Sequence, residues 1–308
     1  MNKKITIIGS GNVGAAAAHW ALARKLGNIV LLDVAEGIPQ GKALDLWQAG
    51  PLDGFAGTVI GSNDYADSAN SDVVIITAGL ARKPGMSRDD LLAKNVAIVK
   101  GCAEQAVRYS PNCFMIVVTN PIDAMVYTAF KASGLPKHRI IGMAGVLDSA
   151  RYRTFLANAL GVAPSDVSAM VMGIHGDKML PLVRLANVAG VPVSDLLPAE
   201  QIAEIVHRTQ HGGGEIVNHL KTGSAFCTPG LAAVEMAEAV LCDTRRVMPC
   251  AAWLEGEFNI SGCFLGVPVV LGAKGVERIL EFQLTGEEKQ ALGESVEAVR
   301  KQMEETGL

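Results

Sequence analysis

Short apolar runs alternate with longer amphipathic stretches through the first half of the chain. Two runs, Val73-Val74-Ile75-Ile76 and Met115-Ile116-Val117-Val118, are apolar without interruption, which is typical of parallel strands covered on both faces. Strands that alternate with helices predict a doubly wound parallel sheet. The pattern predicts strands over 4–8, 28–32, 58–60, 72–77, 113–119 and 139–142, and helices over 12–26, 41–48, 88–109 and 123–133.

The pattern changes after residue 148. It predicts a helix over 149–160, a strand over 167–172, helices over 198–220, 231–242 and 285–304, and a β-rich stretch over 246–271. No repeat, low-complexity tract or linker separates the two halves. We therefore expect two domains, residues 1–147 and an α+β domain of residues 148–308, packed together with the functional site between them.

Composition and charge narrow the class of protein. The chain has 308 residues, is 49% hydrophobic and has a net charge of −4, which favours a folded globular protein over a disordered one. Lys+Arg number 27 against 31 Asp+Glu, so there is no basic excess to bind nucleic acid. The apolar runs are shorter than a signal peptide core or the ~20 residues of a membrane span, so we expect a cytoplasmic protein that does not contact membranes.

The six cysteines form no Cys-x-x-Cys pair. This spacing disfavours a zinc site or a redox dithiol, and we expect buried or half-buried free thiols in a reducing compartment.

A glycine-rich turn follows the first predicted strand. It reads Gly9-Ser10-Gly11-Asn12-Val13-Gly14, and Asp33 ends the second predicted strand. In this pattern the glycines allow a tight turn, close approach to a pyrophosphate and close helix packing, while the acid binds the ribose hydroxyls and disfavours a 2′-phosphate. The turn therefore predicts a Rossmann domain that binds NAD rather than NADP. The alternative is a plain turn with a helix-capping aspartate.

A cationic loop follows the strand predicted over 72–77. It carries Arg82 and Arg88, separated by Pro84 and Gly85. Ligands bind at the carboxyl edge of parallel sheets, and guanidinium groups hold carboxylates through paired hydrogen bonds. The loop thus favours an anionic substrate, with solvated surface arginines as the alternative.

A histidine flanked by glycine ends the strand predicted over 167–172. His175 lies in Gly-Ile-His-Gly-Asp, and a histidine there can exchange a proton near neutral pH. It needs an acid to hold its tautomer, and Asp148 is a candidate partner.

Five motifs occur along the whole chain in the order found in the lactate/malate dehydrogenase family, and the resemblance is greatest to its bacterial, lactate-dehydrogenase-like malate branch. They are the glycine turn with Asp33, Arg-Lys-Pro-Gly-Met-Ser-Arg, Val118-Thr119-Asn120-Pro121, Leu147-Asp148-Ser149-Ala150-Arg151, and Gly-Ile-His-Gly-Asp. The resemblance implies an NAD-dependent hydride transfer at a hydroxyl-bearing carbon.

The resemblance also implies roles for single residues. His175 would accept and donate the substrate proton, and Asp148 would hold its imidazole. Arg151 would bind the carboxylate beside the reacting carbon, and Arg88 would polarise the carbonyl oxygen.

Three further positions resemble family contacts. Asn120 would bind the substrate and, with Val118, lie against the nicotinamide ribose. Asn95 resembles a further cofactor contact on the helix after the loop.

Arg82 matches the position that selects the substrate in this family, where glutamine goes with pyruvate and arginine with oxaloacetate. A second carboxylate needs a cation, so malate is the expected substrate. Ala81 departs from the proline that is common just before this arginine. The alternatives are a lactate or other 2-hydroxyacid dehydrogenase and a non-catalytic NAD-binding sensor.

The resemblance implies a homo-oligomer, expected to be a homotetramer with a dimer as the alternative. The apolar helix over 14–26 and the Ala-rich helix over 232–240 are candidates for its interfaces, or else for core helices.

Other histidines suggest no metal. His207, His211 and His219 share a predicted helix without an acidic ligand or a His-Glu-x-x-His pattern, so we expect an exposed or interface face. Gly212-Gly213-Gly214 predicts a kink or close packing in that helix. We expect His19 to be a packing residue and His138 a surface residue.

Overall fold

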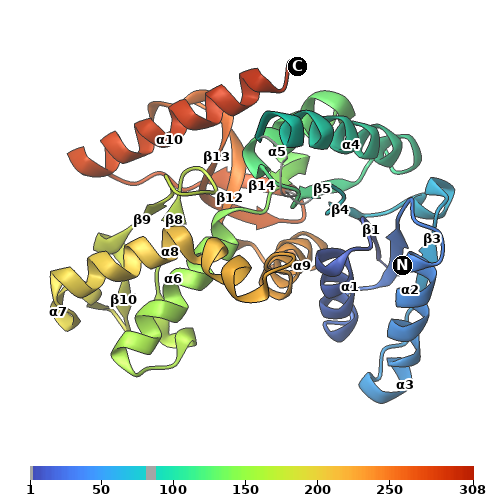
Figure 1. Cartoon of the computed structure of the whole chain (residues 1–308), viewed down its shortest axis with the longest axis horizontal. Coiled ribbons are helices and arrows are strands. Elements are labelled where there is room, and N and C mark those ends of the chain that lie inside the picture. The colour runs from blue at the N-terminus through green and yellow to red at the C-terminus, as the bar shows by residue number, and fades with distance from the viewer. Residues whose placement is uncertain (1–2, 81–87) are drawn as a thin grey trace.

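A single nine-stranded sheet forms the centre of the protein. The computed structural model describes residues 3–80 and 88–308, with the side chains of 88–90 left aside (Figure 1). In spatial order the strands are β14 (Gly275–Ile279), β13 (Ser261–Gly272), β12 (Arg246–Glu255), β6 (Ile140–Gly142), β5 (Phe114–Val117), β4 (Val73–Ile76), β1 (Lys4–Ile8), β2 (Asn28–Leu32) and β3 (Val59–Ser62).

Six strands of this sheet form the predicted doubly wound unit. β1 pairs in parallel with β2 and β4, and the parallel pairing continues to β3 on one side and to β5 and β6 on the other. The chain therefore reverses its direction of progress between β1 and β4, where open α/β sheets bind ligands. The Rossmann prediction is confirmed.

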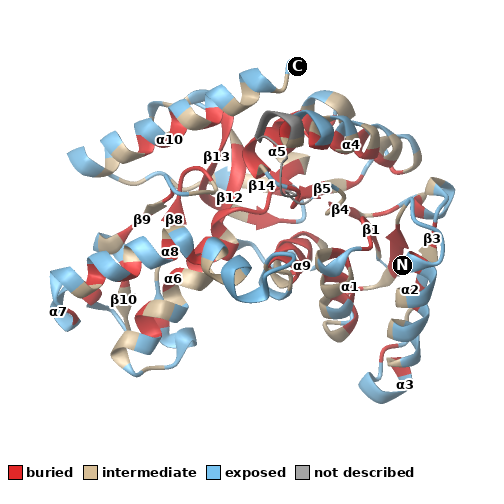
Figure 2. Ribbon diagram, in the orientation of Figure 1, coloured by how far each residue is buried: buried red, intermediate tan, exposed pale blue. Residues whose placement is uncertain are grey.

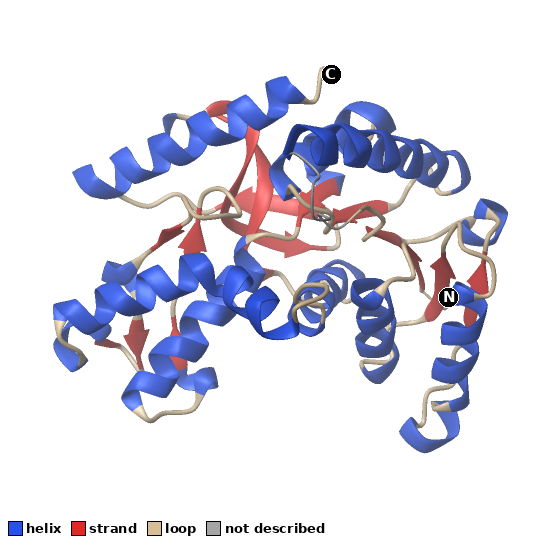
Figure 3. Ribbon diagram, in the orientation of Figure 1, coloured by secondary structure: helices blue, strands red, loops and turns tan. Residues whose placement is uncertain are grey.

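Helices cover both faces of the sheet (Figure 3). α4 (Arg88–Tyr109) and α5 (Ile122–Ser133) lie on one face, and α10 (Gly286–Glu305) packs against α5 and β13. α1 (Asn12–Ala23) and α9 (Cys227–Leu241) lie on the other. The strands between these layers are buried, and most helix residues that face away from them are exposed (Figure 2).

α1 and α9 pack on each other through small residues. A Cβ on Gly230 would lie 2.8 Å from the backbone nitrogen of Ala17, and Ala17, Ala233 and Ala237 are fully buried. These residues of α1 and α9 therefore pack in the core of the chain, and a role of the two helices in a subunit interface stays a prediction.

The second half adds an antiparallel extension and a smaller lobe. β12, β13 and β14 are antiparallel, and β12 joins β6 through the pair Ala251 and Gly142. The lobe holds α6 (Gly145–Leu160), α7 (Val193–Leu196), α8 (Ala199–Leu220), β7 (Val167–Ser168), β8 (Val171–Met172), β9 (Leu180–Pro181), β10 (Asn187–Val188) and β11 (Val191–Pro192).

Short elements complete the chain. α2 (Ile38–Gln48) and α3 (Gly50–Asp53) follow β2. The 3-10 helices are η1 (Tyr65–Ser68), η2 (Lys137–Arg139), η3 (Pro164–Asp166), η4 (Val183–Leu185) and η5 (Glu257–Asn259).

Several element predictions were wrong. The single strand expected over 167–172 is two short strands, because β7 pairs with β10 while β8 pairs with β9. α1 ends at Ala23 rather than at 26, since Lys25 adopts a positive φ of 55° and Leu26 N–H turns back to the carbonyl of Ala21. α6 begins at Gly145, so Asp148 lies in its first turn instead of before the helix.

Three expectations about single side chains also failed. Cys227 and Cys242 are exposed, unlike the buried Cys102, Cys113, Cys250 and Cys263. His19 is exposed on α1 rather than packed.

None of the helices in residues 3–80 and 88–308 is long and apolar enough to cross a membrane.

Candidate active site

The glycine turn between β1 and α1 is tight at Gly9 and Gly14 and leaves free space over Gly11. Gly9 has a φ of +102°, and a Cβ on Gly14 would lie 1.9 Å from the Gly9 carbonyl oxygen, so neither position accepts a side chain. A Cβ on Gly11, in contrast, would meet nothing within 4 Å. The space over Gly11 and the N-terminus of α1, where Asn12 and Val13 begin the helix, fits a pyrophosphate.

Asp33 closes this loop at the end of β2. Its Oδ2 accepts the Ser10 N–H at 2.6 Å and its Oδ1 accepts the Ala35 N–H at 3.0 Å. The carboxylate lines a cavity of about 390 Å³ beside Gly9, Gly11 and Tyr65. Lys42 also supports the loop, because its Nζ donates to the Ser10 carbonyl at 2.6 Å. The cavity, the open glycine and the acid together fit the adenosine half of NAD.

Asn95, Val118 and Asn120 lie at the same sheet edge. Val118 is buried just after β5, and Asn120 is exposed in the turn before α5. The Asn95 side chain accepts the Leu80 N–H at 2.8 Å and donates to the Leu80 and Asn120 carbonyls at 3.3 and 2.8 Å. Asn95 therefore ties the loop after β4 to the loop after β5, and a direct contact with a cofactor stays a prediction.

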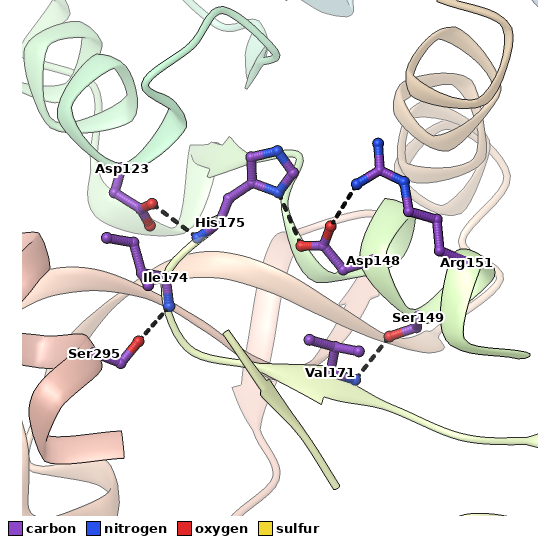
Figure 4. Close-up of polar contacts among 8 residues, drawn as sticks. All are labelled: Asp123, Asp148, Ser149, Arg151, Val171, Ile174, His175 and Ser295. Carbon is purple, nitrogen blue, oxygen red and sulfur yellow. Dashed lines mark hydrogen bonds and ion pairs between the residues drawn. The ribbon is translucent and has the colours of Figure 1, made fainter. Parts of the chain in front are cut away.

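A cluster of charged side chains lies where the two halves of the chain meet (Figure 4). His175 Nδ1 is 2.9 Å from Asp148 Oδ2, and Arg151 donates to the other carboxylate oxygen of Asp148 at 3.4 Å. Asp148 is 1% exposed, whereas the side chains of His175 and Arg151 keep 14% and 13% exposure. One buried carboxylate thus holds a histidine and an arginine that both reach solvent.

The charges of the cluster shift the pKa of His175. Burial lowers the pKa of the imidazole, but the neighbouring Asp148 charge and its hydrogen bond raise it, and the pKa ends above its ordinary value. Arg151 shows the opposite balance, since burial lowers its pKa more than Asp148 raises it. The site therefore stabilises the charged form of His175 relative to a free histidine.

Hydrogen bonds hold the loop that carries His175. The His175 N–H donates to Asp123 Oδ2 at 3.1 Å, and the Ile174 N–H donates to Ser295 Oγ at 2.6 Å (Figure 4). Ser149 Oγ accepts the Val171 N–H at 2.9 Å. None of these three side chains was predicted as a site residue. Ser149 lies within the Leu147–Arg151 motif and Asp123 closely follows a strand end, whereas Ser295 carries no local signal.

A second cavity, of about 700 Å³, opens beside His175 and Arg151 against α8. The Arg151 side chain lies over Gly212 and Gly213, where added Cβ atoms would approach it at 3.3 and 3.7 Å. α8 continues through these glycines, and Gly212 and Gly213 pack closely against Arg151.

Three histidines of α8 line the same cavity. The rings of His207 and His211 stack with centroids 4.2 Å apart, and His219 lies further along. In residues 3–80 and 88–308 no group of three His, Cys, Asp or Glu side chains has the geometry of a metal site.

Two predicted site residues cannot be placed. Arg82 lies outside the described residues. Arg88 begins α4, but its side chain lies outside the description as well.

Two family models match the chain in sequence. Residues 3–142 match the lactate/malate dehydrogenase NAD binding domain, and residues 145–307 match the lactate/malate dehydrogenase alpha/beta C-terminal domain. The chain belongs to the lactate/malate dehydrogenase family. A malate dehydrogenase of Desulforudis audaxviator is 57% identical over 97% of this chain and 96% of its own length, and that of Heliobacterium modesticaldum is 53% identical over 99% of both.

Solved structures of this lactate/malate dehydrogenase family have the same fold. Malate dehydrogenase of Cryptosporidium parvum superposes with a TM-score of 0.97 at 46% identity, covering 100% of this chain and 99% of that one. Lactate dehydrogenase of the same organism, in complex with lactic acid and nicotinamide adenine dinucleotide, has a TM-score of 0.96 at 46% identity, covering 99% and 98%. Fold similarity therefore does not separate the two substrates.

Proposed function

We propose that the chain is an NAD-dependent malate dehydrogenase that interconverts malate and oxaloacetate. The observation that carries this proposal is the cluster of His175, Asp148 and Arg151, which places a proton carrier and a carboxylate-binding cation on one buried acid. The curated relatives at 52–57% identity are malate dehydrogenases, which favours malate over other 2-hydroxyacids.

His175 carries the proton. Because Nδ1 faces Asp148, Nε2 is the ring nitrogen left to face the substrate. In malate oxidation Nε2 accepts the hydroxyl proton, and in oxaloacetate reduction it returns that proton to the new hydroxyl oxygen. Asp148 holds the ring and stabilises its charged form, much as an acid orients the histidine of a hydrolase triad.

The arginines and Asn120 bind and polarise the substrate. Arg151 binds the carboxylate beside the reacting carbon, and its position against Gly212 fixes the direction of the guanidinium group. Arg88 polarises the carbonyl oxygen, and Asn120 donates a hydrogen bond. Arg82 provides the cation for the second carboxylate of a dicarboxylic acid.

NAD supplies the hydride acceptor when bound. The glycine turn (Gly9, Ser10, Gly11, Asn12, Val13 and Gly14) binds its pyrophosphate, and Asp33 binds the adenosine ribose. Val118, Asn120 and Asn95 position or support the nicotinamide end. We assign this cofactor unit to residues 1–147 and the substrate unit to residues 148–308.

Steady-state rates test the proposal. NADH oxidation is measured with oxaloacetate and with pyruvate, and we expect kcat/KM to be at least a hundredfold higher for oxaloacetate, about the discrimination that one well-placed charge provides. The matched variant Arg82→Gln should shift the preference toward pyruvate. A preference of the unmodified enzyme for pyruvate would instead assign it to lactate, and no turnover of either would favour a non-catalytic NAD-binding protein.

Location and assembly complete the proposal. We infer a cytoplasmic homo-oligomer, a tetramer or else a dimer, that takes part in the tricarboxylic acid cycle. Exposed apolar side chains on α2 and α3 support self-association, since Trp47 is 51% and Leu52 is 92% exposed. Light scattering coupled to size-exclusion chromatography measures the subunit number.

A further inference from the structure

Asp123 is a buried acid that the mechanism above does not use. It lies in the first turn of α5, is 1% exposed and points at the loop that carries His175 (Figure 4). Its Oδ2 accepts the His175 N–H at 3.1 Å, while its Oδ1 has no hydrogen-bond partner among the described residues. A buried carboxylate with one unpaired oxygen lowers the stability of the fold. Its presence beside the site therefore suggests a functional role.

We propose that Asp123 is a positioning residue for proton transfer: it anchors the main chain of His175 and, as a second anion on the far side of that residue from Asp148, stabilises the imidazolium form. The proposal rests on the proposed function for its meaning in catalysis. Its physical content, the effect of one carboxylate on one imidazole, does not depend on the substrate.

The geometry surrounds His175 with two carboxylates from two helix N-termini. Asp123 lies in the first turn of α5 and Asp148 in the first turn of α6, where the helix dipole favours a negative charge. Asp148 contacts the ring and Asp123 contacts the backbone of the same residue. Acids on two separate elements therefore hold the backbone and the ring of His175.

The charges around Asp123 are few. Burial raises the pKa of Asp123, the His175 contacts lower it and the Asp148 charge raises it, and together they bring it to about 6. In return the Asp123 charge raises the pKa of His175. On β13 the Cys263 thiol lies close enough for Asp123 to raise its pKa as well.

The other elements packed against α5 add few charges near Asp123. β5 and β6 carry no titratable side chain. α10 presents the Ser295 hydroxyl to the loop, and its Arg300 lowers the pKa of Cys263 that Asp123 raises. Lys178 of the loop and Lys301 and Glu305 of α10 line a cavity with His175. The charged side chains of α4 that the structure describes are exposed to solvent; they are Lys94, Lys100, Glu104 and Arg108. Near neutral pH, Asp123 is therefore an anion whose main cationic partner is His175.

Two variants separate charge from anchoring. Asp123→Asn keeps an oxygen that can accept the His175 N–H but removes the charge. Ser295→Ala is the matched control, since it removes a hydrogen bond to the adjacent Ile174 N–H at 2.6 Å without changing any charge. A residue that only holds the loop should behave alike in both variants.

The experiment is a ¹⁵N NMR titration of the histidine rings in the full-length enzyme with NADH bound. We expect the pKa of His175 to fall in D123N and to stay at the wild-type value in S295A. With oxaloacetate, kcat/KM of D123N above that pKa should fall about three- to tenfold, the effect of losing one nearby charge, with little change at lower pH.

Either of two results would overturn the proposal. One is an unchanged His175 titration in folded D123N, and the other is an equal fall in S295A. If D123N does not fold, Asp123→Ser removes the same charge and is titrated instead. Because the titration needs no turnover, it still decides the role of Asp123 if the enzyme proves to act on another substrate.

Discussion

Asp148 joins His175 to Arg151, and Asp148→Asn tests that link. An asparagine fits the same space but presents an NH2 group to Nδ1, which would then have to accept a hydrogen bond and leave the proton on Nε2. The substrate-facing nitrogen would hold a proton when malate oxidation needs it free. The variant therefore disturbs both the charge and the tautomer of His175.

The size of the effect follows from the two contacts. A charge-assisted hydrogen bond contributes about 1.5–3 kcal/mol when buried. The contact with His175 is short, at 2.9 Å, while that with Arg151 is long, at 3.4 Å, so we count mainly the first. A loss of about 2–3 kcal/mol in the transition state corresponds to about a 30- to 150-fold fall in kcat/KM.

The assay is the initial rate in both directions from pH 6 to 9, with NADH affinity measured by fluorescence. The pH limb set by His175 should move to lower pH, because Asp148 keeps the pKa of that imidazole above its ordinary value. NADH binding should stay unchanged. Rates within threefold of wild type at all pH values would refute our interpretation of this cluster.

Three further predictions concern the cofactor loop and the buried acid. Gly14→Ala should unfold more easily and lose NADH affinity at least tenfold by calorimetry, because its Cβ would lie 1.9 Å from the Gly9 oxygen. Asp33→Ser should raise the NADPH-to-NADH ratio of kcat/KM at least tenfold, since it removes the anion that repels a 2′-phosphate. The carboxyl of Asp123 has its pKa raised from 3.8 to about 6, so its ionisation destabilises the fold by up to about 3 kcal/mol as pH rises from 4 to 7, and urea unfolding of D123N should lack that decline.

Each of these has its own control. Gly11→Ala should also weaken NADH binding but unfold like wild type, because nothing lies within 4 Å of its Cβ; equal destabilisation of both glycine variants would contradict us. For Asp33, an unchanged cofactor ratio would show that another group selects NAD. For Asp123, parallel stability curves of wild type and D123N would mean that folding does not raise the pKa of this carboxyl.

The Rossmann half could be predicted closely from the sequence. The bounds of β1, β2 and α4 agree with the prediction because strand and helix periods are distinct there and turn residues punctuate them. Residues 167–172 were not predicted correctly, since pairing with two different sheets splits a segment that contains no glycine or proline to mark the break.

Some residues of the candidate site could be predicted from the sequence and others could not. The proximity of His175 and Asp148 was anticipated, because both lie in recognisable motifs. Ser295 was not, since a lone serine on the last helix carries no local signal, and only the packing of α10 brings it to the His175 loop. Asp123 lies between these cases, as its role depends on burial that periodicity alone does not reveal.

The single pairing of Ala251 with Gly142 has a consequence for recombining this chain with its relatives. This pair joins the strands of the two halves into one hydrogen-bonded sheet. A Cβ on Gly142 would come within 2.8 Å of the Ala251 Cβ, so the two positions must match in size. A chimaera with a crossover between β6 and β12 would have to keep this β6–β12 pairing. An isolated first half would end in an unpaired edge strand, β6, that could pair with other molecules. The first half therefore should not be exchanged between homologues on its own. Recombined chains should take β6 and β12 from the same parent.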